Sequence, residues 1–482
     1  MKAVVIGGGL GGLATALRLN AGGWQVTVCE AGPSFGGKMN RWRQDGYTFD
    51  TGPSLVTMPH VFARLYEAIG ERMEEHLSLV RVDPHADYRF PCGARVICPD
   101  RVEAWRSAIR QIEPRDLEGF DKLRALGRNL YELSARTFFR RSPAARPSLS
   151  EIAALRYLPI RRGWGNYART VESLFRSPYL RRIYNRYPTY VGSSPYLCPA
   201  TLLVIPFIEH EFGAWYVRGG LYAVVESLLE LARSRNVECL PSARVVAIER
   251  DGERASAVRL ENGTRLAADA VVMNGDADTA PQLLGEPRAS DPGSRSLSGV
   301  VLLLGVRERP AGLGHHTVVF SSGYRAEFDD LFLRREFPQD PTVYISAPAA
   351  SDPSVASPGG DALFVMANAP GNGREWTTDR VDAACAAIRA KLAPVGIDAG
   401  AAEVQDVWHP GRFAARYLAP GGAIYGTNSH GWKNAFFRPP NRSPHVRGLY
   451  FVGGSSHPGG GTPTVLISAE ITSAMMVADA RP

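Results

Sequence analysis

The sequence predicts an α/β fold whose nucleotide-binding sheet is assembled from segments at both ends of the chain. Three observations support this. A short apolar run at 4–6 leads into a glycine turn at 7–12, and a second apolar run at 25–29 ends at Glu30. Near the C-terminus, residues 448–465 contain another strand, a glycine turn and the start of a helix. We therefore expect a discontinuous Rossmann-type domain, a mixed-sheet domain and a helical, basic subdomain.

The N-terminal pattern has the spacing of a dinucleotide-binding βαβ unit. Gly7 permits the tight turn after the strand, Gly9 lets the backbone approach a pyrophosphate, and Gly12 lets the helix at 13–20 pack closely on the strand. The phosphates would lie at the helix N-terminus. Glu30 is placed to accept hydrogen bonds from a ribose hydroxyl, and its negative charge disfavours the 2′-phosphate of NADP.

Further glycine turns follow Glu30, at Gly36-Gly37-Lys38 and Gly52-Pro53. Glycines at such turns let the backbone lie against a flat ligand without intervening side chains. Gly453-Gly454 follows the C-terminal strand, and the helix that begins near 461–465 offers free amide groups to a phosphate or to an electron-rich ring edge.

Several motifs together resemble the phytoene desaturase family, the FAD-dependent carotenoid desaturases and related carotenoid oxygenases of bacteria. They lie at 190–195, 215–220, 269–276, 315–316, 421–426, 438–443 and 457–463, so the resemblance covers almost the whole chain. It implies that FAD binds at Gly7, Gly9, Gly12, Glu30, Gly36, Gly37, Lys38, Gly52, Pro53, Val245, Gly453, Gly454, Gly461, Thr462, Pro463, Thr464 and Val465. One departure is Lys38, where the wider flavoprotein group often has arginine. Lysine keeps the charge and loses the planar fork.

The resemblance implies desaturation of an acyclic carotenoid by hydride transfer to flavin N5 at a membrane surface, with oxygen or a quinone as the electron acceptor. Oxidation of a terminal methyl group and 3,4-desaturation of a 1-hydroxycarotenoid are alternatives within the family. An amine oxidase-like flavoenzyme and a prenyl-chain-binding protein without catalysis are more distant ones.

No acid–base constellation or metal site is evident in the sequence. His457 is a weak catalytic candidate, because a histidine in a tight turn forms hydrogen bonds to backbone groups about as often as it acts on a substrate. The pair His315-His316 is expected to have a structural or substrate-lining role, since successive side chains of a strand point to opposite faces. Glu209 and Glu211 flank an expected strand end.

The motifs divide the chain into five segments. Residues 1–85, 213–290 and 441–482 are expected to form the three parts of the FAD-binding domain. Residues 86–212 would form the helical, basic region for membrane contact and substrate entry. Residues 291–440 would form the sheet that binds the substrate.

Composition places the chain in the cytosol or on the cytosolic face of a membrane. With 482 residues and 45% hydrophobic content the chain can bury a large core, and it contains no apolar stretch long enough to span a bilayer. The first strand follows Met1 directly, so no signal peptide is expected. The six cysteines include no CxxC pair, so we expect free thiols and no zinc site.

Positive charge is concentrated between Arg136 and Arg186. This segment has twelve arginines and two acidic residues, a net charge of +10 against +7 for the whole chain. Bulky apolar residues alternate with the arginines, a combination that suits anionic lipid headgroups. A solvated helical face is the alternative, and a nucleic-acid partner is not expected.

Overall fold

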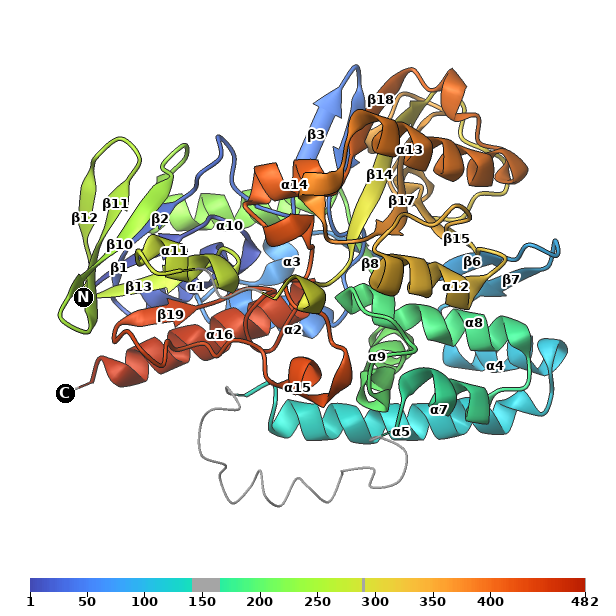
Figure 1. Cartoon of the computed structure of the whole chain (residues 1–482), viewed down its shortest axis with the longest axis horizontal. Helices are drawn as coiled ribbons and strands as arrows, with labels where there is room; N and C mark the ends of the chain where they lie inside the picture. The colour runs from blue at the N-terminus through green and yellow to red at the C-terminus, as the bar shows by residue number, and fades with distance from the viewer. Residues whose placement is uncertain (141–164, 288–290, 482) are drawn as a thin grey trace.

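The computed structural model describes residues 1–140, 165–287 and 291–481. Two sheets stand at opposite ends of the molecule, and both chain termini lie beside the smaller sheet (Figure 1). A group of helices packs below the larger sheet in the same view. Within the described part of the chain, no helix is long and apolar enough to cross a membrane.

The smaller sheet is parallel throughout and has the strand order β19-β13-β1-β2-β9. This confirms the discontinuous Rossmann-type fold, because strands from the start, middle and end of the chain lie side by side. Its strands are β1 (Lys2–Ile6), β2 (Gln25–Cys29), β9 (Glu238–Leu240), β13 (Ala270–Met273) and β19 (Leu449–Phe451).

Helices cover one face of this sheet and a small antiparallel sheet covers the other. Because successive side chains of a strand alternate, Val5 of β1 packs against the helices, whereas Val4 and Ile6 pack toward the small sheet. The helices are α1 (Leu10–Ala21), α2 (Pro59–Glu67), α10 (Tyr222–Ser234) and α16 (Thr462–Asp479), and the small sheet contains β10 (Val245–Asp251), β11 (Arg254–Leu260) and β12 (Arg265–Ala267).

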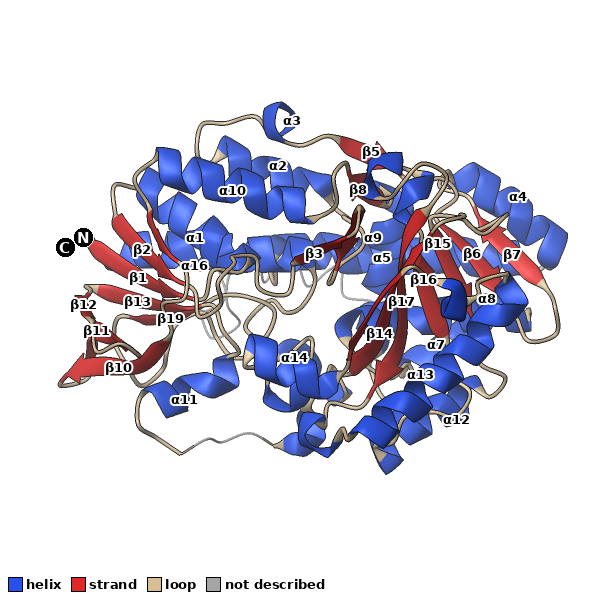
Figure 2. Ribbon diagram, turned by 90° about the horizontal axis from the view of Figure 1, so that it is seen from above, coloured by secondary structure: helices blue, strands red, loops and turns tan. Residues whose placement is uncertain are grey.

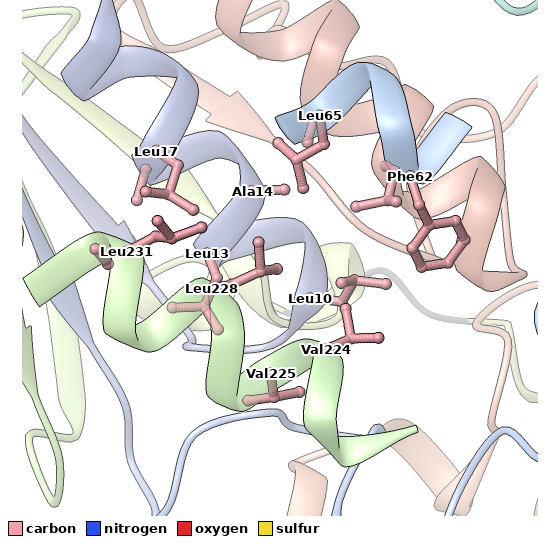
Figure 3. Close-up of a cluster of buried hydrophobic side chains, with 14 of the residues drawn as sticks. Leu10, Leu13, Ala14, Leu17, Phe62, Leu65, Val224, Val225, Leu228 and Leu231 are labelled. Atoms are coloured by element: carbon pink, nitrogen blue, oxygen red, sulfur yellow. The ribbon is translucent and has the colours of Figure 1, made fainter. Parts of the chain in front are cut away.

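The helical layer is a continuous apolar core. Figure 3 shows Leu13 of α1 between Leu65 of α2 and Leu228 of α10. Each of these side chains is at most 1% exposed. Burying a side chain of this size contributes about 1.5–3 kcal/mol. This packing therefore holds the glycine turn of α1 in a fixed place.

The larger sheet has seven strands in the order β18-β14-β17-β16-β15-β6-β7. All neighbours are antiparallel except β15 and β6, so the sheet is mixed, as expected. Its strands are β6 (Ala86–Arg89), β7 (Arg95–Cys98), β14 (Ser298–Val306), β15 (His316–Val319), β16 (Val343–Ser346), β17 (Asp361–Ala369) and β18 (Val404–Trp408). Residues 86–98, which the sequence placed in the helical region, thus extend this sheet.

The helical region packs around a core of aromatic side chains. Trp105, Phe120, Phe175 and Tyr184 are each at most 1% exposed. Asn166 and Ser177 cap two of the helices by accepting hydrogen bonds from backbone N–H groups. The helices are α4 (Val102–Ile112), α5 (Asp116–Arg136), α7 (Tyr167–Leu174), α8 (Pro178–Arg186) and α9 (Val204–Phe212).

Shorter elements connect the two halves of the molecule, which Figure 2 shows from above with the two sheets at its left and right sides. The paired strands are β3 (Arg41–Gln44) with β4 (Tyr47–Asp50) and β5 (Leu79–Arg81) with β8 (Trp215–Val217). The remaining helices are α3 (Met73–His76), α11 (Ala280–Leu283), α12 (Tyr324–Asp329), α13 (Thr378–Leu392), α14 (Pro410–Tyr417) and α15 (Gly431–Phe436).

Candidate active site

A cavity of about 1540 Å³ extends between the two sheets. Pockets for single small ligands usually have volumes of about 300–1,000 Å³, so this cavity has room for more than one. Every residue that the sequence assigned to the cofactor lines it, with the exception of Gly12. The carboxyl ends of β1, β2 and β13 open into it, which is where ligands bind to parallel sheets.

The three N-terminal glycines have separate roles. Gly7 has a φ of +98°, which favours glycine. Gly9 is the N-cap of α1 and faces the cavity. A side chain on Gly12 would overlap the carbonyl oxygen of Gly7, so Gly12 permits the close packing of α1 on β1 and lies behind the cavity wall.

Glu30 is held by two backbone hydrogen bonds. Its Oε2 accepts from the N–H of Gly8 and its Oε1 from the N–H of Gly32, both at 2.8 Å. Charge-assisted bonds of this kind are short and fix the orientation of the carboxylate. A carboxylate has about four lone-pair positions, so Glu30 keeps capacity for ribose hydroxyl groups.

The second glycine turn touches the first. Gly36 forms a backbone bridge with Gly9, and a Cβ on Gly37 would lie 3.3 Å from the Cα of Gly9. The Nζ of Lys38 lines the cavity and donates to the carbonyl oxygen of Ile424 at 2.6 Å. Burial lowers the pKa of Lys38 while Asp276 opposes this shift. Lys38 therefore links the glycine turns to a segment that lies far along the chain.

The C-terminal turn adds a second helix N-terminus. Gly461, with a φ of +119°, is the N-cap of α16, and Thr462 and Thr464 line the cavity. Sequence reasoning missed the role of Asn274, whose Nδ2 donates to the carbonyl of Gly7 at 2.9 Å. The signal available in the sequence was its position: Asn274 is an amide residue that directly follows a buried strand, and that strand ends at the nucleotide-binding edge of the sheet.

These features fit FAD. Two helix N-termini favour phosphate groups, Glu30 suits a ribose, and the glycine turns leave backbone amides accessible to a flat ring. The cavity wall has five basic side chains, and four of them are Lys38, Arg244, Arg416 and Arg438, whose charges complement a pyrophosphate. Arg438 is buried, its guanidinium donates to the carbonyl of Tyr425 at 3.1 Å, and burial lowers its pKa to about 10.

Beyond the glycine turns the cavity becomes apolar. Its walls come from α5, α9, α15, β17 and the segments beside them. The apolar side chains are Leu130, Leu133, Phe138, Phe139, Leu202, Val204, Ile205, Ile208, Phe364, Met366, Trp432, Phe436 and Phe437. Trp432 and Phe437 are 42% and 65% exposed, so they mark the place where the cavity wall meets the surface.

A charged group, Arg186, also lines the cavity. The guanidinium of Arg186 donates to the hydroxyl of Tyr190 at 3.1 Å, and Tyr190 donates to Glu209 at 3.0 Å. The same guanidinium lies over the ring of Tyr344, 5.5 Å from its centroid. Burial opposes the charged form, but Tyr190, Tyr88 and Glu209 outweigh this effect and raise the pKa of Arg186. Arg186 therefore presents a permanent positive charge to the cavity.

The arginines of the 136–186 segment have different surroundings. Arg186 lines the cavity, and Arg181 and Arg182 donate to the backbone carbonyls of Phe175, Ser321 and Ser322. The three side chains are half-buried, and their guanidinium groups are partly engaged by these contacts. Arg140 is exposed, whereas Arg141, Arg161 and Arg162 lie outside the described residues.

The candidate histidines lie outside the cavity lining. The Nε2 of His457 is 2.7 Å from the carbonyl oxygen of Phe138, and its ring packs edge-on against the Phe138 ring. His315 pairs with Ser351 at 2.7 Å and His316 with the hydroxyl of Tyr344 at 2.8 Å. Burial lowers the pKa of His315 to about 4, and that of His316 well below its usual value. These placements favour structural roles, with His316 positioning Tyr344.

The segment around Glu209 differs from the sequence-based expectation. It forms the helix α9 and not a strand end. Glu209 accepts hydrogen bonds from Tyr187 and Tyr190, whereas Glu211 pairs with Arg124 at 3.0 Å. The residues at 204–208 are apolar throughout, and a short apolar run does not distinguish a buried helix from a strand.

Comparison with known proteins identifies the family and supports FAD as the cofactor. A family model described as flavin containing amine oxidoreductase matches residues 10–477. The chain is 33% identical to a 4,4'-diapolycopene oxygenase of Methylomonas sp, covering 99% of this chain and 98% of the relative. It is 35% identical to a zeta-carotene-forming phytoene desaturase of Myxococcus xanthus, covering 98% and 92%. A hydroxyneurosporene desaturase of Rubrivivax gelatinosus is 33% identical, covering 99% and 93%.

Solved structures show the same fold. An oxidoreductase from Methanosarcina mazei superposes with a TM-score of 0.68 at 15% identity, covering 99% of this chain and 100% of that chain. Wild-type putrescine oxidase bound to putrescine superposes with a TM-score of 0.65 at 14% identity, covering 99% of each chain.

Proposed function

The chain belongs to the flavin-containing amine oxidoreductase family, among relatives that are carotenoid desaturases and oxygenases, and we propose that it desaturates an acyclic carotenoid. It is an FAD-dependent oxidoreductase. The finer assignment depends on the site, because the relatives carry out different reactions on related molecules.

The observation that carries this proposal is the continuity of the cavity. One end has the glycine turns, helix N-termini and basic side chains that suit FAD, and the other end has the apolar walls that suit a long polyene. When bound, FAD supplies the oxidising capacity by accepting the two electrons that are removed with the two hydrogens of adjacent carbons. The apolar walls orient the chain and exclude water. Oxygen or a quinone would then reoxidise the cofactor.

The test is expression in cells that accumulate phytoene, diapophytoene, neurosporene or a 1-hydroxycarotenoid, followed by chromatography and mass measurement of the pigments. We expect products that have lost pairs of hydrogens and absorb at longer wavelengths. Products that have gained oxygen at a terminal methyl group would indicate the oxygenase reaction instead. An enzyme with bound flavin that changes none of these pools would contradict carotenoid chemistry.

Arg186 supports a second candidate, the oxidation of a carotenoid that already has an oxygen atom near one end. A hydrocarbon chain offers no acceptor to a guanidinium, whereas a hydroxyl or carbonyl oxygen does. Retaining a charge in an apolar cavity is costly unless the charge has partners. Arg186 has Tyr190 and retains further donors for such an oxygen. Comparison of the hydrocarbon and 1-hydroxycarotenoid pools in the same experiment distinguishes the two candidates.

We also propose that the enzyme takes its substrate from an anionic membrane surface. Trp432 and Phe437 combine exposure with a place in the cavity wall, and Lys433 lies between them in the sequence. Aromatic side chains beside basic ones suit the interface of a bilayer with anionic lipid.

A further inference from the structure

Three potential metal ligands meet outside the cavity. They are His85, which precedes β6, Cys98 at the end of β7, and His210 on α9. One donor atom from each residue lies within 4.8 Å of the others, in a search of the described residues. Each residue is at most 3% exposed, and none of the three lines the active-site cavity.

Both imidazole rings have an unused nitrogen. The Nδ1 atoms of His85 and His210 are buried without a hydrogen-bond partner. The Nε2 of His210 faces the hydroxyl of Tyr184 at 3.2 Å. The Nε2 of His85 is approached by two groups, the N–H of Ala214 at 3.1 Å and the Oδ1 of Asp100 at 3.0 Å. Nδ1 is therefore the nitrogen of each ring that is available to a ligand.

The surroundings of His85 favour an ion over a proton at Nδ1. If Nε2 accepts from Ala214, the proton must be on Nδ1, where it has no acceptor, and the Oδ1 of Asp100 also has no donor. If a metal ion binds Nδ1, Nε2 carries the proton and donates to Asp100. In that arrangement only the N–H of Ala214 lacks a partner. Without the ion, both the Nδ1–H of His85 and the Oδ1 of Asp100 lack one. A carboxylate that orients a metal-binding histidine is a common outer partner of such sites.

We propose that His85, Cys98 and His210 bind one thiophilic transition ion, Zn²⁺ or copper. Two imidazoles and one thiolate form a ligand set that suits these ions. Binding would release the thiol proton of Cys98 to the solvent. The ligand atoms, which lie within 4.8 Å of one another, would move closer together on binding the ion. Rings of Trp105 and Phe120 pack against His210 and keep its surroundings apolar.

The ion would connect the edge of the large sheet to α9. Ile205 and Ile208 of α9 line the active-site cavity, whereas His210 of the same helix belongs to the cluster with His85 and Cys98. A bound ion would therefore hold α9 in place, and this helix forms one wall of the substrate region. This inference does not depend on which carotenoid is oxidised.

Metal content of the FAD-loaded enzyme tests the proposal. The enzyme is exposed to Zn²⁺, or to copper under reducing anaerobic conditions, passed through a desalting column and assayed by mass spectrometry. We expect about one ion per chain to be retained in at least one of the two arms. Cys98→Ser should lose this ion, whereas Cys385→Ser, which removes another buried free thiol, should keep it.

A second variant keeps all three proposed ligands. Asp100→Asn should weaken binding about 10–100-fold through the loss of the outer partner of His85. Flavin content of each variant reports whether the fold is intact. With Co²⁺ in place of Zn²⁺, a thiolate charge-transfer band should appear in the wild type and be absent in Cys98→Ser. Retention of neither ion by the wild type, or equal retention by Cys98→Ser with its flavin bound, would overturn the proposal.

Discussion

Single glycines determine whether the nucleotide loop can bind its ligand. The Cβ of an alanine at position 9 would lie 3.1 Å from the Nδ2 of Asn274 and 3.8 Å from the carbonyl oxygen of Gly36, so the Asn274 side chain needs to move by only a few tenths of an ångström. The fold should therefore tolerate Gly9→Ala, while the new methyl group enters the space of the pyrophosphate. We expect the purified variant to contain little FAD, as measured by its visible absorption.

The matched control is Gly22→Ala at the other end of the same helix. Gly22 has a φ of −83°, and its Cβ would lie 3.3 Å from the Leu19 carbonyl oxygen and 3.6 Å from both the Arg18 carbonyl oxygen and the Cγ2 of Val477. Gly22 lies outside the cavity lining, so this variant should retain its FAD. Full FAD content in Gly9→Ala would contradict the assignment of this loop to the pyrophosphate.

Arg186 is the residue that should separate polar from apolar substrates. A hydrogen bond to a charged group contributes about 1.5–3 kcal/mol, which corresponds to about tenfold or more in rate. Arg186→Met should lower the conversion of a 1-hydroxycarotenoid by this factor and leave that of a hydrocarbon substrate much less affected. Arg176→Met, a change at an exposed arginine of the same segment, should affect neither. Equal losses for both substrates would assign Arg186 to the general shape of the cavity.

At the scale of the element, one buried carboxyl group joins a helix to a strand. Glu327 of α12 accepts hydrogen bonds from the N–H and hydroxyl of Thr342, at 3.1 and 2.6 Å. Burial raises the pKa of Glu327 from 4.5 to about 7, although these hydrogen bonds oppose the shift. The folded state therefore binds a proton that the unfolded chain has already released. The resulting stabilisation is complete below pH 4.5 and is lost as the pH rises to about 7.

Replacing this carboxyl group with an amide should remove its pH dependence. For Glu327→Gln, the free energy of unfolding relative to the wild type should increase by up to about 3 kcal/mol between these two pH values. Urea unfolding across this pH range measures the difference. Asp329→Asn on the same helix is the control and should leave the slope unchanged. Parallel pH profiles for wild type and Glu327→Gln would show that Glu327 does not hold its proton.

At the scale of the whole molecule, the mouth of the cavity should be the surface that meets lipid. Burying an aromatic side chain contributes about 1.5–3 kcal/mol, so replacing both Trp432 and Phe437 with serine should weaken binding to anionic vesicles about tenfold or more. Co-sedimentation measures this binding, and raised salt should weaken the wild type through its basic residues. Leu333→Ser is the control, because Leu333 is 70% exposed and lies outside the cavity lining. Equal losses in both variants would contradict a lipid-binding mouth.

The whole molecule also creates the substrate region. The apolar wall combines α5 and α9 from the helical region, β17 from the large sheet and α15 from the C-terminal third. None of these elements has a sequence motif that marks it as a substrate contact. The cavity exists because the five-stranded sheet and the seven-stranded sheet are held apart by the shorter elements that connect them (Figure 2).

Local patterns were sufficient for the nucleotide-binding half. The apolar runs ending at Ile6, Cys29 and Met273 became parallel strands. Gly7 and Gly9 fell at the turn between strand and helix, and Gly12 fell in the first turn of α1. These features are encoded by residues that are neighbours in sequence. Apolar alternation, a positive φ and helix start signals act over a few residues, so the sequence by itself determined this part of the fold and most of the cofactor loop.

Long-range packing decided the remainder. Residues 86–98 became the last two strands of the large sheet because β15 offered β6 a partner, and β7 then paired with β6 at the edge. Arg186 of α8 lines the cavity through the packing of that helix. Cysteine spacing predicted no metal site, yet the fold brings Cys98 beside His85 and His210. Contacts between segments distant in the chain leave no local pattern. The sequence by itself therefore determined the strands and glycine turns at which we place the dinucleotide, whereas only the tertiary structure decided which side chains line the apolar cavity and which ones meet in the buried cluster.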